Sequence, residues 1–497
     1  MEVVLRLGNF SFNGKTSPYV NYMDYKTHYG LERDVQYSEV VGRPGGVLSR
    51  VKENVRVIET NLIIDAYDTG RKLEDVADDI VSWLSTNEPA PLIFDREPDK
   101  VYYAILNESL DPTYFVSFSK VSVKFLCIDP FKYSRDESKN PIIEDSVTLA
   151  TNGNAEYKPR LELTALKDTP YLAIGTSNND FLAFGDPFVP NQSTTSKNPR
   201  ILLDPMNTLS GWQHQTTGEI LANNWTGGKV SGSMTTNSNY TAFRAKDYGA
   251  ETGWRGPLVK KSLTKTVADF KITCSLKIFD IDEGIGKGFY HFYDEAGKVV
   301  CALGLVDDEK DGRAVKAVIQ VFNDYGEAKT LLNYRGDNGT AYKNLEIYIQ
   351  LERFNNKFTI KTWNYYIDKN GKRQQRSRLK EDIRQVFTDN GRVYQRPIRQ
   401  VSAYIASHSS FPTSVVYMTR IEVLELISQQ GTDYFIKKGD NVIVDFEDQV
   451  ITVNDEIRND KKDFFSSYFD IKNNPQELVV LPNNTFSGYA IWRDKWQ

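Results

Sequence analysis

The sequence predicts a mainly β protein in which one small β domain is interrupted by a larger one. At 497 residues the chain is too long for a single core. Aromatic residues make up 12% of it, and they fit the half-buried surface of a sheet. Apolar and polar residues alternate between turn signals along most of the chain, whereas only one stretch has helical spacing. These observations favour several β domains.

The last seventy residues predict half of a β-sandwich. Apolar residues alternate over 442–447 and 450–454 around the polar turn Asp448-Gln449, which is typical of a hairpin. Two further short runs, 477–481 and 489–492, complete the set. This number of strands buries too little surface to be stable alone. We therefore expect the other half of the sandwich to lie upstream.

A matching half precedes residue 200, with predicted strands at 159–163, 171–174 and 180–184. Residues 186–199 are rich in Pro, Ser, Thr and Asn and read as a linker. We therefore interpret residues 201–427 as an insertion, because insertions are tolerated at exposed loops whose ends lie close together. The predicted domains are 1–135, 136–200 joined with 428–497, and 201–427.

The first 135 residues predict a β domain with one helix and a long hairpin. Residues 72–85 carry apolar side chains at i, i+3, i+4 and i+7 spacing, which indicates a helix. A tip at residues 42–46 lies between two predicted strands, 34–41 and 55–67, and we expect it to contact a neighbouring subunit. The candidate oligomerisation residues are Arg43, Pro44, Gly45 and Gly46. The other predicted strands are 3–12, which ends at the turn Asn13-Gly14, 91–94, 101–106 and 117–127.

Four motifs in this domain resemble the N-terminal domain of the distal tail proteins of siphophages that infect Gram-positive bacteria. They are FSFNGKTSPY, VVGRPGG, WLSTNEPAPLIFDREPDKVYYAIL and FLCIDPFKYS. The segment IKKGDNVIVDFEDQVITVNDE in the split domain resembles the galectin-like second domain of that family. The resemblance implies a ring, usually hexameric, at the virion tail tip, between the tail tube protein and the tail-associated fibre or lysin. It also implies that residues 201–427 are an inserted, jelly-roll-like carbohydrate-binding module.

No catalytic or metal-binding pattern stands out, so we expect no enzyme activity, cofactor or metal. The four histidines lie far apart, and the three cysteines have no CxxC spacing. Neither GxSxG nor a P-loop occurs. Acidic clusters such as Asp307-Asp308-Glu309 read as solvated turns. A cell-wall glycoside hydrolase with accessory β domains remains the alternative, since such sites are recognised by geometry.

Charge and hydropathy indicate neither nucleic-acid binding nor membrane insertion. The net charge is −5, and no apolar run of about 18 residues or signal peptide occurs, so we expect synthesis in the host cytoplasm. Residues 363–400 are locally basic, but they lack the interleaved aromatic residues of a nucleic-acid site. We interpret them as a solvated loop with a short helix, or as a contact for phosphates of a cell-wall polymer.

Five aromatic residues of the insert are candidates for binding a host cell-wall saccharide, because sugar rings present apolar faces that lie well on aromatic rings. Trp212, Trp225 and Trp254 lie among Gly, Asn, Ser and Thr, which suits a glycan site and a sandwich core equally. Residues 345–352 alternate before the turn Asn355-Asn356, and a two-residue turn there places Tyr348 opposite Trp363. That pair is either structural or an exposed stacking platform.

Overall fold

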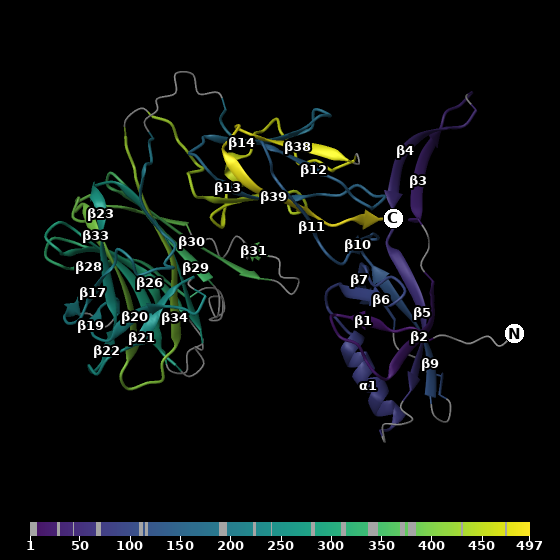
Figure 1. Ribbon diagram of the computed structural model, residues 1–497, viewed down its shortest axis with the longest axis horizontal. Helices are drawn as coiled ribbons and strands as arrows, with labels where there is room; N and C mark the ends of the chain where they lie inside the picture. The colour runs from purple at the N-terminus through teal and green to yellow at the C-terminus, as the bar shows by residue number, and fades with distance from the viewer. Residues whose placement is uncertain are drawn as a thin grey trace. The chain divides into compact units, whose positions relative to one another are not determined.

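The computed structural model of the chain consists mainly of β-strands, with one α-helix among the residues it describes (Figure 1). The predicted mainly β fold is therefore confirmed. The chain divides into two compact units, Met1–Pro187 with Phe435–Gln497, and Phe188–Tyr434. The structure describes residues 7–26, 30–42, 44–65, 71–108, 113–114, 118–187, 196–221, 225–239, 241–279, 284–309, 315–335, 346–367, 373–375, 384–428, 431–472 and 475–497.

The N-terminal part of the first unit is a nine-stranded sheet packed against the helix. The predicted helix is confirmed as α1, Leu73–Leu84, which buries Val76, Ile80 and Leu84 because they share one face. The turn after the first strand is confirmed by positive φ at Asn13 and Gly14. The strands are β1 (Phe10–Phe12), β2 (Val20–Lys26), β5 (Arg56–Asp65), β6 (Ala90–Phe94), β7 (Lys100–Leu106), β8 (Thr113–Tyr114), β9 (Phe118–Cys127), β10 (Lys132–Ser134) and β40 (Lys495–Trp496).

The long hairpin has a different second strand from the predicted one. Strand β3 (Arg33–Glu39) pairs with β4 (Gly46–Glu53), and these two pair with no other described strand. The expected partner, residues 55–67, forms β5, which lies between β2 and β9 in the main sheet. Gly42 and Gly45 have positive φ at the tip, which lets the chain reverse within a few residues. The nearer partner is favoured because a short loop costs less entropy to close.

The split domain is a sandwich in which each sheet combines strands from both sides of the insertion. Strand β13 lies between β35 and β39, and β38 lies between β12 and β14. Neither half therefore forms a continuous sheet by itself. The six-stranded sheet holds β11 (Ser138–Pro141), β13 (Arg160–Ala165), β35 (Asn441–Asp445), β36 (Val450–Val453), β37 (Glu456–Ile457) and β39 (Phe486–Trp492). The four-stranded sheet holds β12 (Ser146–Leu149), β14 (Tyr171–Thr176), β15 (Phe181–Gly185) and β38 (Gln476–Leu481).

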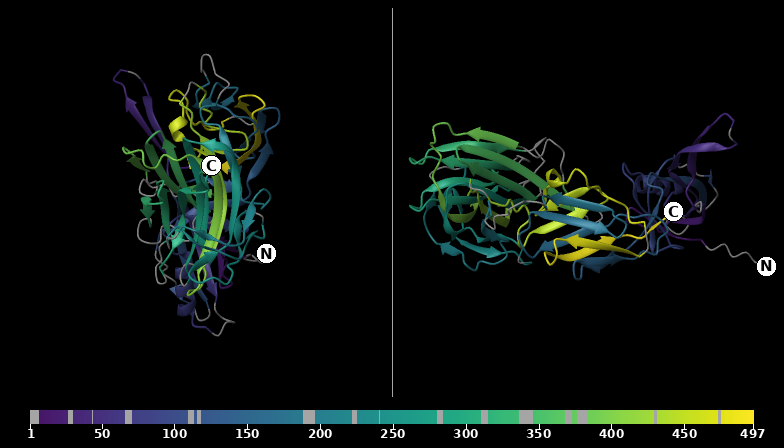
Figure 2. Two further views of the ribbon diagram at one scale, coloured as in Figure 1. Left: turned by 90° about the vertical axis from the view of Figure 1, so that its left-hand side faces the viewer. Right: turned by 90° about the horizontal axis from the view of Figure 1, so that it is seen from above.

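The second unit is a larger sandwich, and its two layers can be followed in Figure 2. One sheet holds β16 (Arg200–Asp204), β20 (Ser233–Thr236), β21 (Phe243–Asp247), β24 (Phe270–Phe279), β29 (Glu346–Phe354), β30 (Lys357–Ile367), β31 (Arg373–Gln375), β32 (Arg384–Thr388) and β34 (Val415–Glu425). The other holds β17 (Gln213–Gln215), β18 (Glu219–Ile220), β19 (Gly228–Val230), β22 (Trp254–Gly256), β23 (Leu258–Val267), β25 (Gly286–Tyr293), β26 (Val299–Asp307), β27 (Lys316–Phe322), β28 (Ala328–Tyr334) and β33 (Ile398–His408).

The chain enters and leaves this second unit side by side. Strand β16 pairs with β34, and Ser196 forms a parallel bridge with Thr432. The amide of Ile427 donates to the carbonyl of Lys197 at 2.8 Å. These contacts bring the two ends of the insertion together, as an insertion into a loop requires.

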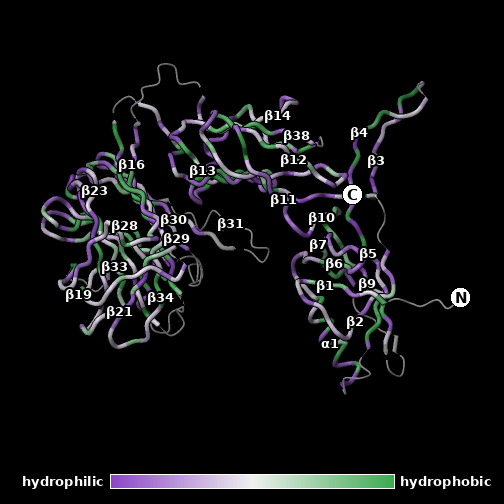
Figure 3. The backbone as a smooth tube through the Cα atoms, viewed as in Figure 1, coloured by the Kyte–Doolittle hydropathy of each residue, from purple (hydrophilic) through white to green (hydrophobic). Residues whose placement is uncertain are grey.

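Hydrophobic and hydrophilic residues follow one another along many strands, as expected where one strand face is buried (Figure 3). Strands β25 and β27 differ, because every residue in them is buried. Both faces of the second unit's ten-stranded sheet are therefore covered at this place.

Within the basic stretch 363–400 the structure describes the strands β31 and β32, and no helix occurs in its described residues.

Candidate functional site

The insert's ten-stranded sheet has an outer face, which we define as the face turned away from the other sheet. Alternate residues of β25, such as Tyr290 and Phe292, belong to the core between the two sheets. The residues between them, such as Phe289, belong to separate clusters on the other side. By strand register, the outer face carries Lys287, Phe289, His291, Tyr293, Val299, Ala302, Gly304, Val306, Lys316, Val318, Gln320, Phe322, Gln400, Ser402, Tyr404 and Ala406.

Two basic side chains of β25 are buried on this face. Lys287 and His291 lie four residues apart on one strand, and both are fully buried. The ammonium of Lys287 donates to the carbonyl of Trp225 at 3.2 Å and lies 4.2 Å from the ring centroid of Trp254. His291 Nε2 lies 2.8 Å from the carbonyl oxygen of Thr226. Burial lowers the pKa of Lys287 to about 7 and that of His291 to about 4.

A pocket of about 240 Å³ opens on the same face, at Lys260 and Tyr293. Its polar wall includes Lys260, whose ammonium lies 4.2 Å from the ring centroid of Tyr293. The Tyr293 hydroxyl lies 2.9 Å from Ser402 Oγ, which orients the ring. Burial lowers the pKa of Lys260. The lining residues are Gln215, Thr217, Gly218, Glu219, Ile220, Leu221, Val230, Leu258, Lys260, Tyr293, Gly297 and Val299.

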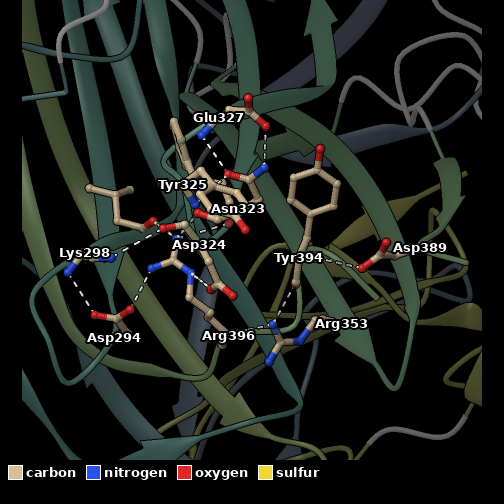
Figure 4. A network of polar contacts seen from close by, with 12 residues as sticks. Asp294, Lys298, Asn323, Asp324, Tyr325, Glu327, Arg353, Asp389, Tyr394 and Arg396 are labelled. Carbon is tan, nitrogen blue, oxygen red and sulfur yellow. Dashed lines mark hydrogen bonds and ion pairs between the residues drawn. The ribbon is translucent and has the colours of Figure 1, made fainter. Parts of the chain in front are cut away.

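Arg396 holds the turn that forms one wall of this pocket (Figure 4). Its guanidinium pairs with Asp294 at 2.6 Å and donates to the carbonyl of Val299 at 2.5 Å. It also donates to the carbonyls of Phe322 and Asn323, in the next hairpin. One planar side chain therefore joins two turns, with the several donors that such a contact needs.

The three tryptophans of residues 212–254 lie in different surroundings. Trp212 is part of the core, and its indole Nε1 donates to Asp204 Oδ2 at 2.9 Å. Trp225 and Trp254 are half-buried and pack against the clusters of the outer face. Their assignment to saccharide binding stays a prediction.

The residues of the outer face were not predicted from the sequence. Lys287 and His291 are four residues apart on one strand, and this spacing indicates that they share a face. Nothing in the sequence placed Lys260 beside Tyr293.

The predicted pairing of Tyr348 with Trp363 is confirmed, but the pair is not an open platform. The register is as expected, with Leu351 opposite Ile360, and Asn355 has positive φ at the turn. The two rings stack with centroids 5.0 Å apart and planes 3° from parallel. Trp363 is nevertheless only 2% exposed and Tyr348 only 3%. Register decides which side chains are neighbours, whereas the cover over that face depends on other parts of the chain.

The β3–β4 hairpin is exposed along nearly its whole length. Val41 is fully exposed, and the cross-strand partners Tyr37 and Leu48 are 62% and 61% exposed. Pro44, Gly45 and Gly46 lie exposed at the tip, and Arg43 lies outside the described residues. An exposed apolar surface of this kind is typical of a site of protein–protein contact.

Four strands of the outer face carry no carboxylate at their outward positions. Glycoside hydrolases use a pair of carboxyl groups across the sugar. None of the outward positions of β25, β26, β27 and β33, all of which the structure describes, carries Asp or Glu. In the described ranges no group of three or more His, Cys, Asp or Glu side chains is placed to hold a metal ion.

The N-terminal sheet of the first unit is the part of the chain that matches a known protein family. Residues 11–127 match the family described as the phage tail protein RIFT-related domain. The predicted relationship to siphophage tail proteins is therefore confirmed, through this region of the chain. No curated protein matches the chain. No helix in the described part of the chain is long and apolar enough to cross a membrane.

Solved structures similar to the chain include distal tail proteins and glycoside hydrolases. SPP1 Dit is 19% identical, with a TM-score of 0.33, and the match covers 37% of this chain and 76% of that one. The CBM2 module of the Lactobacillus casei BL23 phage J-1 evolved Dit is 14% identical, with a TM-score of 0.38, and covers 48% of this chain and 100% of that one. A Bacteroides ovatus family 16 glycoside hydrolase is 11% identical, with a TM-score of 0.28, and covers 45% and 99%.

Proposed function

We propose that the chain is the distal tail protein of a siphophage, with an inserted module that binds a saccharide of the host cell wall. The family match over residues 11–127 is the observation that carries the first half of this proposal. By analogy with the family, the N-terminal domain forms a ring, of six copies, between the tail tube protein and the tail-associated fibre or lysin. The protein then resides in the virion, at the tail tip, and acts without catalysis.

The β3–β4 hairpin is the surface we assign to contact between copies. Its two strands carry Val35, Tyr37, Val47, Leu48 and Val51 as exposed side chains, which a neighbouring subunit would cover. The backbone groups along the outer edges of both strands are unpaired with other described strands, so they can also extend a neighbour's sheet.

The test replaces residues 36–50 with an Asn-Gly turn, which keeps the Val35–Val51 pair next to the turn. We expect the full chain to form a ring by negative-stain imaging and mass photometry, and the shortened chain to stay monomeric with α1 still folded. Phe464→Ser, a change at an exposed residue of the split domain, is the matched control and should leave the ring mass unchanged. A ring of normal mass from the shortened chain would remove the hairpin from the interface.

The saccharide-binding half of the proposal rests on the pocket of the outer face. It combines an oriented aromatic ring, apolar side chains and a few polar groups, which is the usual composition of a small-molecule site. Purified protein should adsorb to host cell walls without releasing reducing sugar. Turnover would instead support the glycoside hydrolase alternative, and the absence of carboxylates from the outward strand positions argues against that outcome.

A further inference from the structure

We infer that the pocket of the insert takes a saccharide unit that carries a negative charge, with Lys260 as the residue that recognises the charge. This inference rests on the proposed saccharide-binding function and names the chemical class of the ligand. The charged group is a carboxylate, as in a uronic acid, or a phosphodiester, as in a polyol phosphate. Both are anions that accept hydrogen bonds from an ammonium group.

Lys260 has no acidic partner in the part of the chain that the structure describes. Within the described residues, no carboxylate lies within ion-pair distance of its ammonium, and burial is the sole cause of its lowered pKa. Glu219 also lines the pocket, but its side chain is exposed. Its charge acts on Tyr404: burial is the main cause of the raised pKa of Tyr404, and the charge of Glu219 is the second. A partly desolvated cation without a counter-charge is unfavourable, and an anionic ligand would remove that cost.

Near pH 7, Lys287 adds part of a positive charge on the same face of the sheet, whereas His291 is neutral, because burial lowers their pKa values to about 7 and about 4. Lys287 and, more weakly, Lys260 both lower the pKa of His291, so the two cations act on the same region of the outer face. No Asp or Glu occupies an outward position on the four strands there. Of the residues that line the pocket, Lys260 is the partly buried cation and Glu219 is the one carboxylate, which is exposed, so the site favours an anion over a cation.

The pocket has room and an apolar wall for one sugar unit. Its volume of about 240 Å³ is small for a drug-sized ligand and suits a single ring with its substituents. The ring of Tyr293 and the side chains of Ile220 and Val299 supply apolar surface. Because Ser402 holds the Tyr293 hydroxyl and Arg396 holds the turn at Val299, this wall is oriented before a ligand binds.

The test measures binding of three probes to the full chain by calorimetry. The probes are tetragalacturonate, a glycerol-phosphate oligomer of similar length, and neutral maltotetraose. We expect one of the two anionic probes to bind at least tenfold more tightly than the neutral one, and which of them does so identifies the source of the charge. This preference should shrink when the salt concentration is raised from about 0.05 to about 0.5 M.

Three variants and one control assign the effect to the pocket. Lys260→Met keeps an aliphatic side chain over Tyr293 and should weaken binding of the preferred anionic probe about tenfold. Lys260→Arg keeps the positive charge and should retain that binding. Thr217→Trp fills the pocket and should abolish binding of every probe. Lys246→Met, a change at an exposed residue of the other sheet, should bind like the wild type. Equal melting temperatures establish that the variants are folded.

Two outcomes overturn the inference while leaving saccharide binding in place. One is tight binding of the neutral probe with no preference for an anion. The other is adsorption to host walls that Lys260→Met and Thr217→Trp leave unchanged. If the wild-type chain binds neither the walls nor any probe, the proposed saccharide-binding function fails together with the inference.

Discussion

Individual buried side chains in the insert decide which substitutions affect stability. Trp363 and Tyr348 stack within 5.0 Å and are almost fully buried, so Trp363→Ala would leave a large cavity. We expect a loss of about 3–5 kcal/mol in the free energy of unfolding of the insert. Denaturant unfolding followed by tryptophan fluorescence measures it. Tyr325→Ala, which removes a ring that is almost wholly exposed, is the control and should change little; an unchanged midpoint for Trp363→Ala would show the pair to be a surface feature.

Asp307 gives the stability of the insert a dependence on pH. Burial, helped by the charges of Asp308 and Glu309, raises its pKa to about 7. Between about pH 4 and 7 the folded state therefore holds a proton that the unfolded state has lost, and this group's contribution to stability falls as the pH rises.

Asp307→Asn should remove that fall. We expect the variant to gain roughly 1–3 kcal/mol over the wild type at pH 8 and much less at pH 5. Thermal melts at the two pH values test this. Asp308→Asn removes only a minor cause of the raised pKa of Asp307 and also breaks the ion pair with Lys316, so it should gain less than Asp307→Asn at pH 8. An equal effect of Asp307→Asn at both pH values would contradict the assignment.

At the scale of elements, Arg396, in the loop that precedes β33, ties together the turns of two hairpins, β25–β26 and β27–β28. Its guanidinium contacts Asp294, Asp324 and carbonyls of both hairpins. Arg396→Gln would leave buried partners unsatisfied, and we expect a loss of about 2–4 kcal/mol. Arg335→Gln, at an exposed pair with Glu309, should cost less than about 1 kcal/mol.

Hydrogen exchange distinguishes a local role of Arg396 from a general one. The amides of residues 294–299 and 323–327 should lose protection first in Arg396→Gln, because these turns depend on its contacts. Uniform loss of protection over the whole insert would show that the network supports the core and not the turns. Selective loss of protection at these turns would show that Arg396→Gln disturbs the pocket wall at Val299 in particular.

At the scale of the whole molecule, the insertion should be separable from the protein that carries it. Each unit has its own hydrophobic core. A Cβ placed on Gly185 would lie 2.6 Å from the ring of Phe435, so the two ends of the interrupted domain meet. We expect residues 1–186 joined to 435–497 by a short Gly/Ser linker to fold and form the ring.

The complementary piece, residues 196–434, should fold alone and adsorb to host walls. Circular dichroism and negative-stain imaging test the first piece, and cosedimentation with cell walls tests the second. A first piece that is insoluble, under conditions in which the full chain assembles, would mean that the split sandwich needs its insert. A folded second piece that does not adsorb would count against the saccharide site.

Local features of the fold could be predicted from the sequence, because they depend on neighbours along the chain. The spacing of Val76, Ile80 and Leu84 specifies α1, and Asn355 at the turn specifies the register that stacks Tyr348 on Trp363. Tertiary structure alone decided which faces are covered, since burial arises from contacts between distant segments. It buried the Tyr348–Trp363 pair and brought Lys260 to Tyr293 from 33 residues away. Alternation and the position of a turn predict which side chains pair across two strands. Whether such a pair is buried or exposed depends on what the rest of the folded chain places over it.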